Sequence, residues 1–325
     1  MPQPYPLLFE PFFQDYLWGG RKLGTVLGKP IPPHGVWAES WEVVEHPTHT
    51  SRIINGPLAG KTLADVRTTA ADWLLGSHCT AAARFPLLLK YLDCQRVLSV
   101  QVHPDDDYAS RMPQPDQGKT EAWYIIDREP GARIYAGLQP GVSPEDLRAA
   151  LANGDVERLL HVLHPEPGDA VFIPAGTVHA LGAGLLVAEI QQSSNATFRL
   201  FDWNRVGPDG QPRPLHIDQA LDVIDFHSGP RTVQTPQPTA SASRQRLVQC
   251  QKFVLDRVIA PGDILAGDDR FHIITVPIGS ARLRYSGGEL ELSRGQSALL
   301  PAAMEKTNLE LNGAAVLLDM FEPAP

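Results

Sequence analysis

The sequence has few of the features that mark secreted proteins, membrane proteins and proteins with cysteine-bound metals. Its 325 residues include three cysteines, Cys79, Cys94 and Cys250, which lie far apart and form no metal-binding or redox motif. No apolar run approaches the roughly 18 residues of a membrane span, and the N-terminal stretch MPQPYPLLFEP lacks the basic start and long apolar segment of a signal peptide. These absences predict a cytoplasmic protein in a reducing compartment, without a membrane partner.

Basic residues are also in deficit. The chain has 28 Lys and Arg against 37 Asp and Glu, a formal net charge of −9, which argues against nucleic acid as a partner. An anionic small molecule would have to bind at a local basic cluster. The composition, 43% hydrophobic and 20% charged, is that of an ordinary globular protein, and the length favours two domains.

Thirty prolines and 27 glycines divide the sequence into many short segments, which favours strands and turns over long helices. Helical spacing of apolar residues nevertheless predicts helices over 62–75, from Ser143 to a stop at Asn153-Gly154, and over 216–224. Alternation and β-branched residues predict strands over 41–44, 97–103, 122–126, 170–173, 185–191 and 197–201.

A change in composition and an internal repeat indicate the domain organisation. Residues 227–246 are rich in Pro, Thr, Gln, Ser and Ala and predict a linker. GDAVFIP at 168–174 recurs as GQSALLP at 295–301, but Ala303 and Lys306 stand where the first copy has Gly176 and His179. We therefore expect a first domain over 1–226 with helical insertions, a linker over 227–246, and a second β domain over 247–325 that lacks these two residues.

The stretch VLSVQVH at 97–103 is the first candidate for a functional strand. In a strand Ser99, Gln101 and His103 share one face, and the other face is aliphatic. Such a polar face suits a barrel that holds a ligand, and on this stretch alone a half-exposed strand with solvated polar residues is an equally good interpretation.

The segment GDAVFIPAGTVH at 168–179 resembles the second half of the cupin signature, in which the closing histidine points into the barrel. Together with His179, the side chains of Gln101, His103 and Glu121 form a mixed N/O ligand set that suits a divalent, zinc-like ion. Gln101 replaces the first histidine of the usual cupin pattern. This neutral ligand leaves positive charge on a dication to polarise substrate oxygens, and it disfavours an iron oxygenase.

Four longer motifs occur in order and carry a closer resemblance: QVHPDD at 101–106, GKTEAWYII at 118–126, FIPAGTVHAL at 172–181 and EIQQSSNATFRLFDWNR at 189–205. With LWGGRKL at 17–23, AESWEV at 38–43 and FPLLLKYLD at 85–93, they resemble the type I mannose-6-phosphate isomerases in their short bacterial form. The resemblance implies a mainly β fold of two cupin-type jelly-roll β-barrels with a few inserted helices. It also implies one Zn²⁺ per chain in a catalytic, metal-binding domain over 1–226, with the ligands falling on Gln101, His103, Glu121 and His179, and a metal-free second cupin-like domain over 247–325.

The family interconverts mannose 6-phosphate and fructose 6-phosphate, so a phosphorylated hexose is the expected partner. Arg199, on the alternating run TFRLF, is a candidate cation for the phosphate. Lys90, Lys119 and the hydroxyl of Ser99 are further candidates, and the resemblance places Lys90, Ser99 and Arg199 around the sugar phosphate.

Isomerisation through an enediol needs a base, and two residues compete for this role beside Arg199 in the catalytic set. Glu189 matches an acidic position of the family, and burial would raise its pKa toward neutrality. Lys119 lies two residues from a predicted metal ligand. Glu189 could equally orient a ligand or Arg199. Many relatives have Asp where this chain has Asn195, which puts an acid-base or arginine-orienting role at that position in doubt.

Other functions and features stay open at this point. The alternatives are a non-catalytic, metal-dependent regulator that binds sugar phosphates, a cupin isomerase for another sugar, and, third, a metal oxygenase. The assembly is expected to be a monomer or homodimer. Asp105, Asp106 and Asp107 lack the spaced oxygens of a calcium loop and predict a solvated turn, and His272 has no assigned role.

Overall fold

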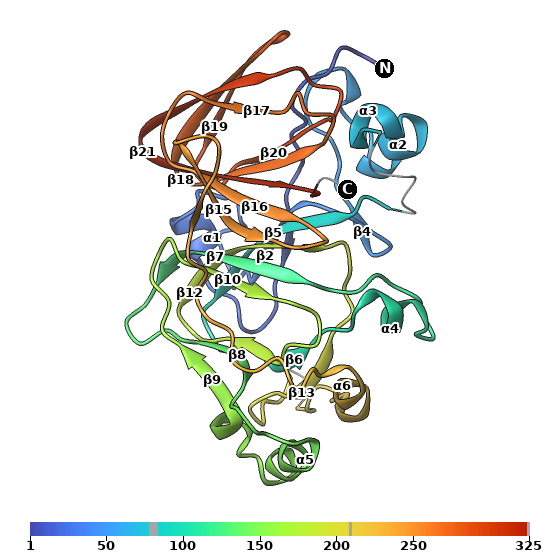
Figure 1. Ribbon diagram of the computed structural model, residues 1–325, viewed down its shortest axis with the longest axis vertical. Coiled ribbons are helices and arrows are strands. Elements are labelled where there is room, and N and C mark those ends of the chain that lie inside the picture. Colours follow the sequence, from blue (N-terminus) through green and yellow to red (C-terminus); the bar gives the residue numbers. More distant parts are fainter. Residues whose placement is uncertain (78–83, 208–209, 324–325) are drawn as a thin grey trace.

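Antiparallel strands make up most of the chain in the computed structural model, which describes residues 1–77, 84–207 and 210–323 (Figure 1). Cys79 lies outside these residues. The predicted mainly β fold with a few short helices is confirmed. Three larger sheets are stacked along the long axis of the molecule, with the C-terminal sheet at the top of Figure 1 and β8 and β9 toward the bottom.

A six-stranded sheet forms the middle of the stack. Its order is β1-β2-β5-β12-β7-β10, and every neighbouring pair is antiparallel. The strands are β1 (Phe12–Gln14), β2 (Glu39–Val43), β5 (Leu87–Cys94), β12 (Leu185–Gln192), β7 (Glu121–Arg128) and β10 (Ala170–Ile173).

A five-stranded sheet in the order β13-β6-β11-β8-β9 covers one face of the first. It consists of β13 (Phe198–Phe201), β6 (Val100–Val102), β11 (His179–Leu181), β8 (Ile134–Leu138) and β9 (Leu160–Leu163). Trp123, Ile125 and Val187 of the six-stranded sheet are in one buried cluster with Ala136 and Leu181 of the five-stranded sheet. The two sheets thus enclose a common inner space, which is apolar at this end.

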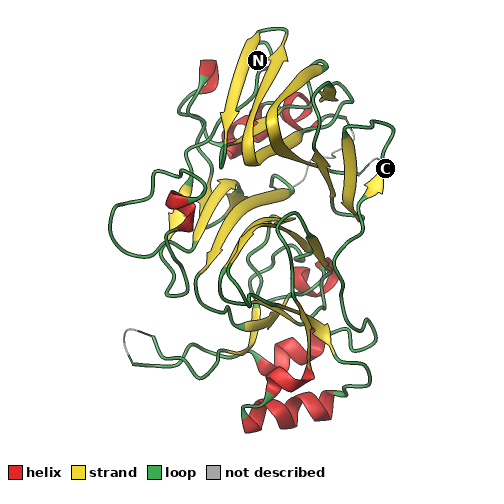
Figure 2. Ribbon diagram, turned by 90° about the vertical axis from the view of Figure 1, so that its left-hand side faces the viewer, coloured by secondary structure: helices red, strands yellow, loops and turns green. Residues whose placement is uncertain are grey.

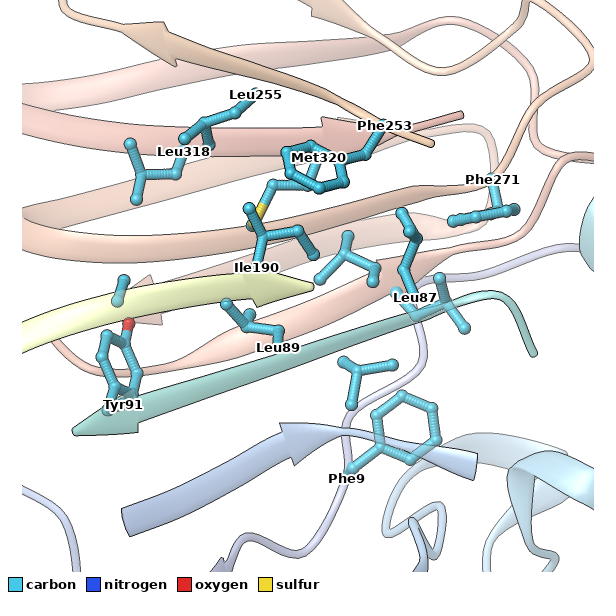
Figure 3. Packing of buried hydrophobic residues seen from close by; sticks show 14 of the residues in the cluster. Phe9, Leu87, Leu89, Tyr91, Ile190, Phe253, Leu255, Phe271, Leu318 and Met320 are labelled. Atoms are coloured by element: carbon cyan, nitrogen blue, oxygen red, sulfur yellow. The ribbon is translucent and has the colours of Figure 1, made fainter. Parts of the chain in front are cut away.

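The C-terminal sheet packs on the opposite face of the six-stranded sheet. It contains β14 (Gln237–Pro238), β15 (Arg244–Gln249), β16 (Val254–Val258), β21 (Thr307–Phe321), β18 (His272–Tyr285) and β19 (Gly288–Ser293), with β17 (Asp263–Leu265) on β21 and β20 (Ser297–Leu300) on β18. Leu87, Leu89 and Ile190 meet Phe253 and Met320 in one continuous core (Figure 3). Alternation explains this arrangement, because successive residues of β5 and β12 point to opposite faces.

The remaining elements are short and lie at the edges of the sheets (Figure 2). They are α1 (Lys22–Thr25), α2 (Leu63–Thr69), α3 (Ala71–Leu75), α4 (Asp106–Ser110), α5 (Pro144–Asn153), α6 (Ile217–Val223), the 3₁₀ helices η1 (Gly56–Leu58) and η2 (Val156–Leu159), and the two-residue strands β3 (Glu45–His46) and β4 (His49–Thr50). No helix among the described residues is long and apolar enough to cross a membrane.

The expected helices are present, with one interruption. A capping box formed by Ser143 and Asp146 starts α5, and Gly154 ends it in the left-handed conformation. The helix expected over 62–75 is instead two helices, because Ala70 leaves helical geometry at φ −156° and ψ 53°.

The strand expected over 97–103 is shorter than predicted. β6 spans only Val100–Val102. The carbonyls of Val97 and Leu98 accept hydrogen bonds from the side chains of Arg205, at 2.5 Å, and Trp203, at 2.7 Å, so side chains take two positions that a sheet partner would have used. Ser99 therefore lies just before the strand, and its side chain is buried.

The repeated segments take up equivalent local structures. Gly168 and Gly295 have positive φ values of 96° and 79°, and each precedes a four-residue strand, β10 and β20. Strand β14 and the start of β15 lie within 227–246. The domain boundaries stay a prediction.

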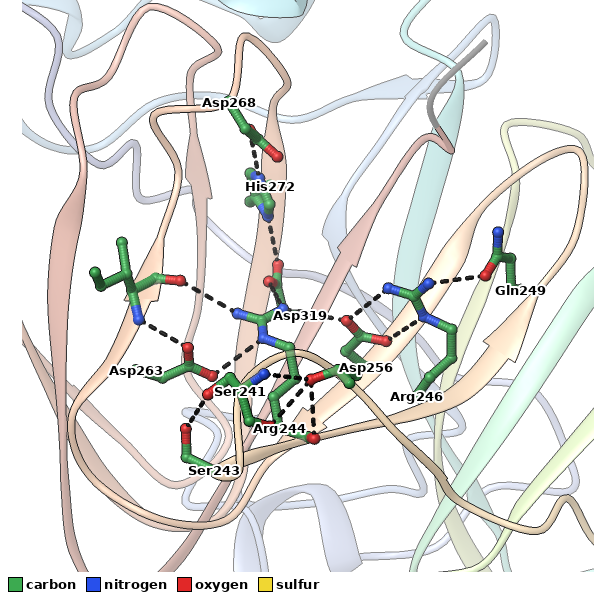
Figure 4. A network of polar contacts seen from close by, with 12 residues as sticks. Ser241, Ser243, Arg244, Arg246, Gln249, Asp256, Asp263, Asp268, His272 and Asp319 are labelled. Carbon is green, nitrogen blue, oxygen red and sulfur yellow. Dashed lines mark hydrogen bonds and ion pairs between the residues drawn. The ribbon is translucent and has the colours of Figure 1, made fainter.

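An ion-pair network runs from the buried interior of the C-terminal sheet to an exposed aspartate, Asp268 (Figure 4). His272 contacts Asp319 through Nδ1 at 2.8 Å and Asp268 through Nε2 at 3.1 Å, and Arg244 Nη1 lies 2.6 Å from Asp319. Burial lowers the pKa of His272, but the two carboxylates outweigh burial and raise it to about 9. His272 is therefore a charged, structural histidine at neutral pH.

Candidate active site

Strand register brings two of the predicted ligands and Arg199 onto one face of the five-stranded sheet. Gln101 of β6 stands directly opposite His179 of β11 on one side and Arg199 of β13 on the other. Directly opposed residues in antiparallel strands point to the same face. His103 follows β6 and is two residues from Gln101, and it is completely buried.

His103, Glu121 and His179 converge between the two sheets. One ligand atom from each lies within 4.8 Å of the others, and all three side chains are buried. The Glu121 carboxylate is 3.4 Å from His103 Nε2 and 3.2 Å from His179 Nε2. Three of the four predicted metal ligands thus form one cluster.

Backbone carbonyls orient both imidazoles. Nδ1 of His103 donates to the carbonyl of Ala196 at 2.9 Å, and Nδ1 of His179 donates to the carbonyl of Thr177 at 2.8 Å. These bonds make each Nε2 an acceptor on the side of the ring that faces Glu121, which is the arrangement of metal-binding histidines. Burial and the Lys119 ammonium lower the pKa of His103 to about 3, so its imidazole is neutral and able to bind a cation.

Glu121 shows that the cluster fits a divalent cation. Both of its carboxylate oxygens are buried without a hydrogen-bond partner, although Lys119 Nζ forms an ion pair with Oε2 at 2.8 Å. Burial raises the pKa of Glu121, but Lys119 and His103 outweigh burial and hold it well below its usual range. An ionised carboxylate between two imidazole lone pairs is a ligand set typical of zinc.

The fourth predicted ligand, Gln101, lies beside this cluster. Its Nε2 is 3.3 Å from His179 Nε2. Rotation of the amide by 180° about its last bond would present the oxygen at the same point, and oxygen is the atom that binds a cation. Lys119 also reaches the cluster, since its Nζ lies 3.0 Å from His103 Nε2.

A second buried charge cluster lies on the inner face of the six-stranded sheet. Trp41, Lys90, Glu189 and Trp123 are aligned on four neighbouring strands by their register. Glu189 Oε2 accepts the indole hydrogen bond of Trp123 at 2.8 Å, and its Oε1 lies 3.1 Å from Lys90 Nζ. Lys90 is also 3.5 Å from Glu39, so two carboxylates share one ammonium.

The environment of Glu189 changes its proton affinity. Burial and the Glu121 carboxylate raise the pKa of Glu189, and Lys90 opposes them. Burial lowers the pKa of Lys90, but Glu189 and Glu39 outweigh burial and hold it above its ordinary value. Trp123 links this cluster to the first, because its ring packs edge-on against His179 with centroids 5.4 Å apart.

Arg199 belongs to a third, cationic group at β13, an edge strand of the five-stranded sheet. Its Nη1 donates to the carbonyl of Pro214 at 2.9 Å, and its buried Nε has no hydrogen-bond partner. Burial and the nearby Arg213 lower the pKa of Arg199. Arg205 and Arg213 both bind the carboxylate of Asp202, so this single carboxylate offsets only part of the charge of the three guanidinium groups.

Several members of these clusters are not among the residues that the sequence predicts for the site. Glu39, Trp41 and Trp123 stand in the motifs AESWEV and GKTEAWYII, but nothing in the sequence indicates that they face Glu189 or Lys90. Arg205 ends the motif at 189–205. Its position six residues after Arg199 is the sequence signal that could have placed it in the same basic group.

Known proteins resemble this chain over nearly its whole length. A family model described as "Phosphomannose isomerase type I, catalytic domain" matches residues 7–125. "Probable mannose-6-phosphate isomerase GmuF" of Bacillus subtilis is 37% identical over 309 residues, 94% of this chain and 96% of that protein. "Mannose-6-phosphate isomerase ManA" of the same organism is 34% identical over 311 residues, with the same coverage of 94% and 96%. A crystal structure of mannose 6-phosphate isomerase from B. subtilis superposes with a TM-score of 0.88 at 33% identity, covering 97% of this chain and 99% of that one.

Proposed function

The chain belongs to the type I phosphomannose isomerase family, and from this we propose that it interconverts mannose 6-phosphate and fructose 6-phosphate with one Zn²⁺ held by Gln101, His103, Glu121 and His179. The observation that carries the proposal is the buried Glu121 carboxylate, which faces two imidazole lone pairs without a hydrogen-bond partner. When bound, the ion would supply positive charge that polarises the open-chain oxygens at C1 and C2 of the sugar.

The protein's own residues bind the phosphate and transfer the proton. Arg199 has a buried Nε without a partner and lies in a group with excess positive charge, so we assign the phosphate to it. Arg205 and Trp203 bind the carbonyls of the two residues before Ser99. Ser99 itself is buried, so we assign its hydroxyl to the same group.

We assign Lys90 two roles, binding of the substrate and neutralisation of nearby carboxylates. Its ammonium is held between Glu189 and Glu39, at 3.1 Å and 3.5 Å, so it neutralises carboxylates as well as offering charge to the sugar phosphate. This pairing keeps the inner face from carrying two uncompensated negative charges, which would repel an anionic substrate.

Two residues remain candidates for the base. Glu189 has a raised pKa and is fixed by Trp123, so it is equipped to remove the C2 proton of the aldose and return it to C1. Lys119 contacts two predicted ligands and competes for the proton transfer or for opening the ring. Glu189→Gln and Lys119→Met decide between them: the variant that lacks the base should bind metal but lose deuterium exchange between solvent and sugar.

The test is a coupled assay that detects fructose 6-phosphate formed from mannose 6-phosphate. We expect one zinc per chain, loss of activity on chelation, and recovery with added zinc. Full activity after complete removal of the metal would overturn the zinc proposal. Sugar-phosphate binding that requires metal but gives no turnover would favour the non-catalytic regulator, and substrate profiling distinguishes an isomerase for another sugar.

Two coarser expectations stand beside the proposed activity. We propose that the protein works in the cytoplasm, since its substrate is a phosphorylated metabolite and its cysteines form no disulfide framework. We propose a monomer or homodimer, which light scattering of the purified chain would distinguish from a larger assembly.

A further inference from the structure

His103 and Glu121 stand at the two ends of one loop. β6 of the five-stranded sheet ends at Val102 and β7 of the six-stranded sheet begins at Glu121, so residues 104–120 cross from one sheet to the other between two predicted ligands. The separation of these ligands therefore depends on how the base of this loop is closed. The backbone N–H of Lys119 donates to the carbonyl of Pro104 at 2.9 Å, which is one such closure.

Asp106 makes the other contacts that close the loop. Its Oδ1 accepts hydrogen bonds from the backbone N–H of Gly118 at 2.8 Å and from Nε2 of Gln192 at 2.9 Å. Its Oδ2 forms an ion pair with Lys252 Nζ at 2.5 Å. One carboxylate thus joins the start of the loop, the end of the loop, strand β12 and the C-terminal sheet.

Gly118 is required for this close approach. A Cβ built on Gly118 would lie 2.5 Å from the carbonyl carbon of Asp105, which is closer than real Cβ atoms come to backbone. The first residue of the motif GKTEAWYII therefore lets the returning chain pass directly against the start of α4.

Gln192 connects Asp106 to Thr120, the residue before Glu121. Its Oε1 accepts from the N–H of Thr120 at 3.1 Å, and its own N–H donates to the carbonyl of Thr120 at 3.2 Å. Since the same amide group donates to Asp106, Asp106 and Thr120 are held at a fixed separation.

The two neighbouring aspartates have different roles and provide a comparison. Asp105 caps the N-terminus of α4 through a hydrogen bond from the N–H of Tyr108 at 2.8 Å. Asp107 is exposed and pairs with Arg111 one turn along the same helix. Asp106 alone of the three contacts Gly118, Gln192 and Lys252.

We propose that Asp106 is a positioning residue of the metal centre, and that Lys252 makes the C-terminal sheet part of this centre by holding Asp106 in place. Lys252 lies between β15 and β16, so the contact joins the C-terminal sheet to the loop that carries the ligands. The proposal rests on the proposed function only in requiring that His103, Glu121 and His179 bind a divalent cation.

The experiment measures metal affinity and metal geometry in the full-length protein. Zn²⁺ affinity is obtained by competition with a chromophoric chelator, and Co²⁺ in the same site reports ligand geometry through its visible absorption. Asp106→Ala should weaken Zn²⁺ binding by roughly 10–100-fold, the usual cost of losing a group that orients ligands. Asp107→Ala is the matched control and should leave affinity and spectrum unchanged.

Lys252 tests the contribution of the C-terminal sheet. The ion pair is partly exposed, so Lys252→Met should weaken Zn²⁺ binding by a smaller factor, about 2–5-fold, and Lys252→Arg should restore it. High salt should reduce the affinity of the parent toward that of Lys252→Met, because screening acts on the same pair.

The outcomes separate this proposal from the proposed function. If the parent binds no metal, the zinc proposal fails and the positioning role fails with it. If the parent binds Zn²⁺, and Asp106→Ala binds it within twofold with an unchanged Co²⁺ spectrum, only the positioning role is overturned. If Asp106→Ala does not fold, Asp106→Asn, which keeps one acceptor oxygen, and Lys252→Met decide by the same measurements.

Discussion

Replacing Lys90 with methionine tests the buried charge cluster beside the metal site. The side chains of Lys90, Glu39 and Glu189 are only 10%, 10% and 4% exposed, so removal of the ammonium would leave two carboxylates buried without a cation between them. Loss of one partner from a buried ion pair costs about 3–5 kcal/mol, because the remaining charge stays desolvated. We expect Lys90→Met to lower the free energy of unfolding at pH 7 by about this amount.

The pH dependence follows from the directions of the pKa shifts. Glu189 has a raised pKa, so its contribution to stability is present at low pH and is lost as the pH rises through its folded-state pKa. Without Lys90 this pKa rises further. The destabilisation of Lys90→Met should therefore shrink as the pH is lowered from 7 toward 5, where the carboxylates take up protons.

Urea unfolding followed by circular dichroism measures these differences, and a second substitution sharpens the test. Lys90→Met combined with Glu189→Gln should recover much of the lost stability, because one uncompensated charge is removed. Arg111→Met is the control: Arg111 pairs with Asp107 on the surface, and its loss should cost less than about 1 kcal/mol. A loss below about 1 kcal/mol for Lys90→Met would refute the reasoning, as would a double variant with additive losses.

Three further predictions concern the metal, the C-terminal network and the loop. Zn²⁺ at 100 times its Kd should stabilise the parent by about 2.7 kcal/mol in thermal melts but leave Glu121→Gln unaffected, and equal stabilisation of both would exclude Glu121 as a ligand. The raised pKa of His272 means that its contribution to the free energy of unfolding is complete below about pH 6.5 and is lost as the pH rises through about 9. The parent should lose up to about 3 kcal/mol over this range, and a His272→Gln variant with the same loss would contradict this assignment. Gly118→Ala should cost about 1–3 kcal/mol through overpacking against Asp105, and an unchanged urea midpoint would show that the loop gives way freely.

The sequence predicted the cluster of His103, Glu121 and His179 because much of its signal is local. Alternation placed Gln101 and His103 on one face, and the turn motif before His179 indicated an inward histidine. The structure brings Glu121 to the same point. The face of the strand on which each of these side chains lies depends on a few neighbouring residues, and these are visible in the sequence.

The charge pairs could not be predicted in the same way, because they depend on register between distant strands. Lys90 meets Glu189 only because β5 and β12 pair at that register. Asp106, expected in a solvated turn, instead contacts Lys252, which is 146 residues away. The same limit applies to the start of β6. The strand begins later than predicted because Trp203 and Arg205, more than 100 residues further along, bind the carbonyls of the residues before it.

The two differently used faces of β12 have a consequence for how this protein tolerates mutation. Glu189 and Gln191 face the enclosed inner space, whereas Ala188 and Ile190 belong to the core shared with the C-terminal sheet. A saturation library scored separately for cellular abundance and for turnover should show the two scores alternating along this strand. Substitutions at 188 and 190 should deplete the protein, whereas Glu189→Gln, which keeps the side-chain size and an acceptor for Trp123, should leave it more abundant but reduce turnover.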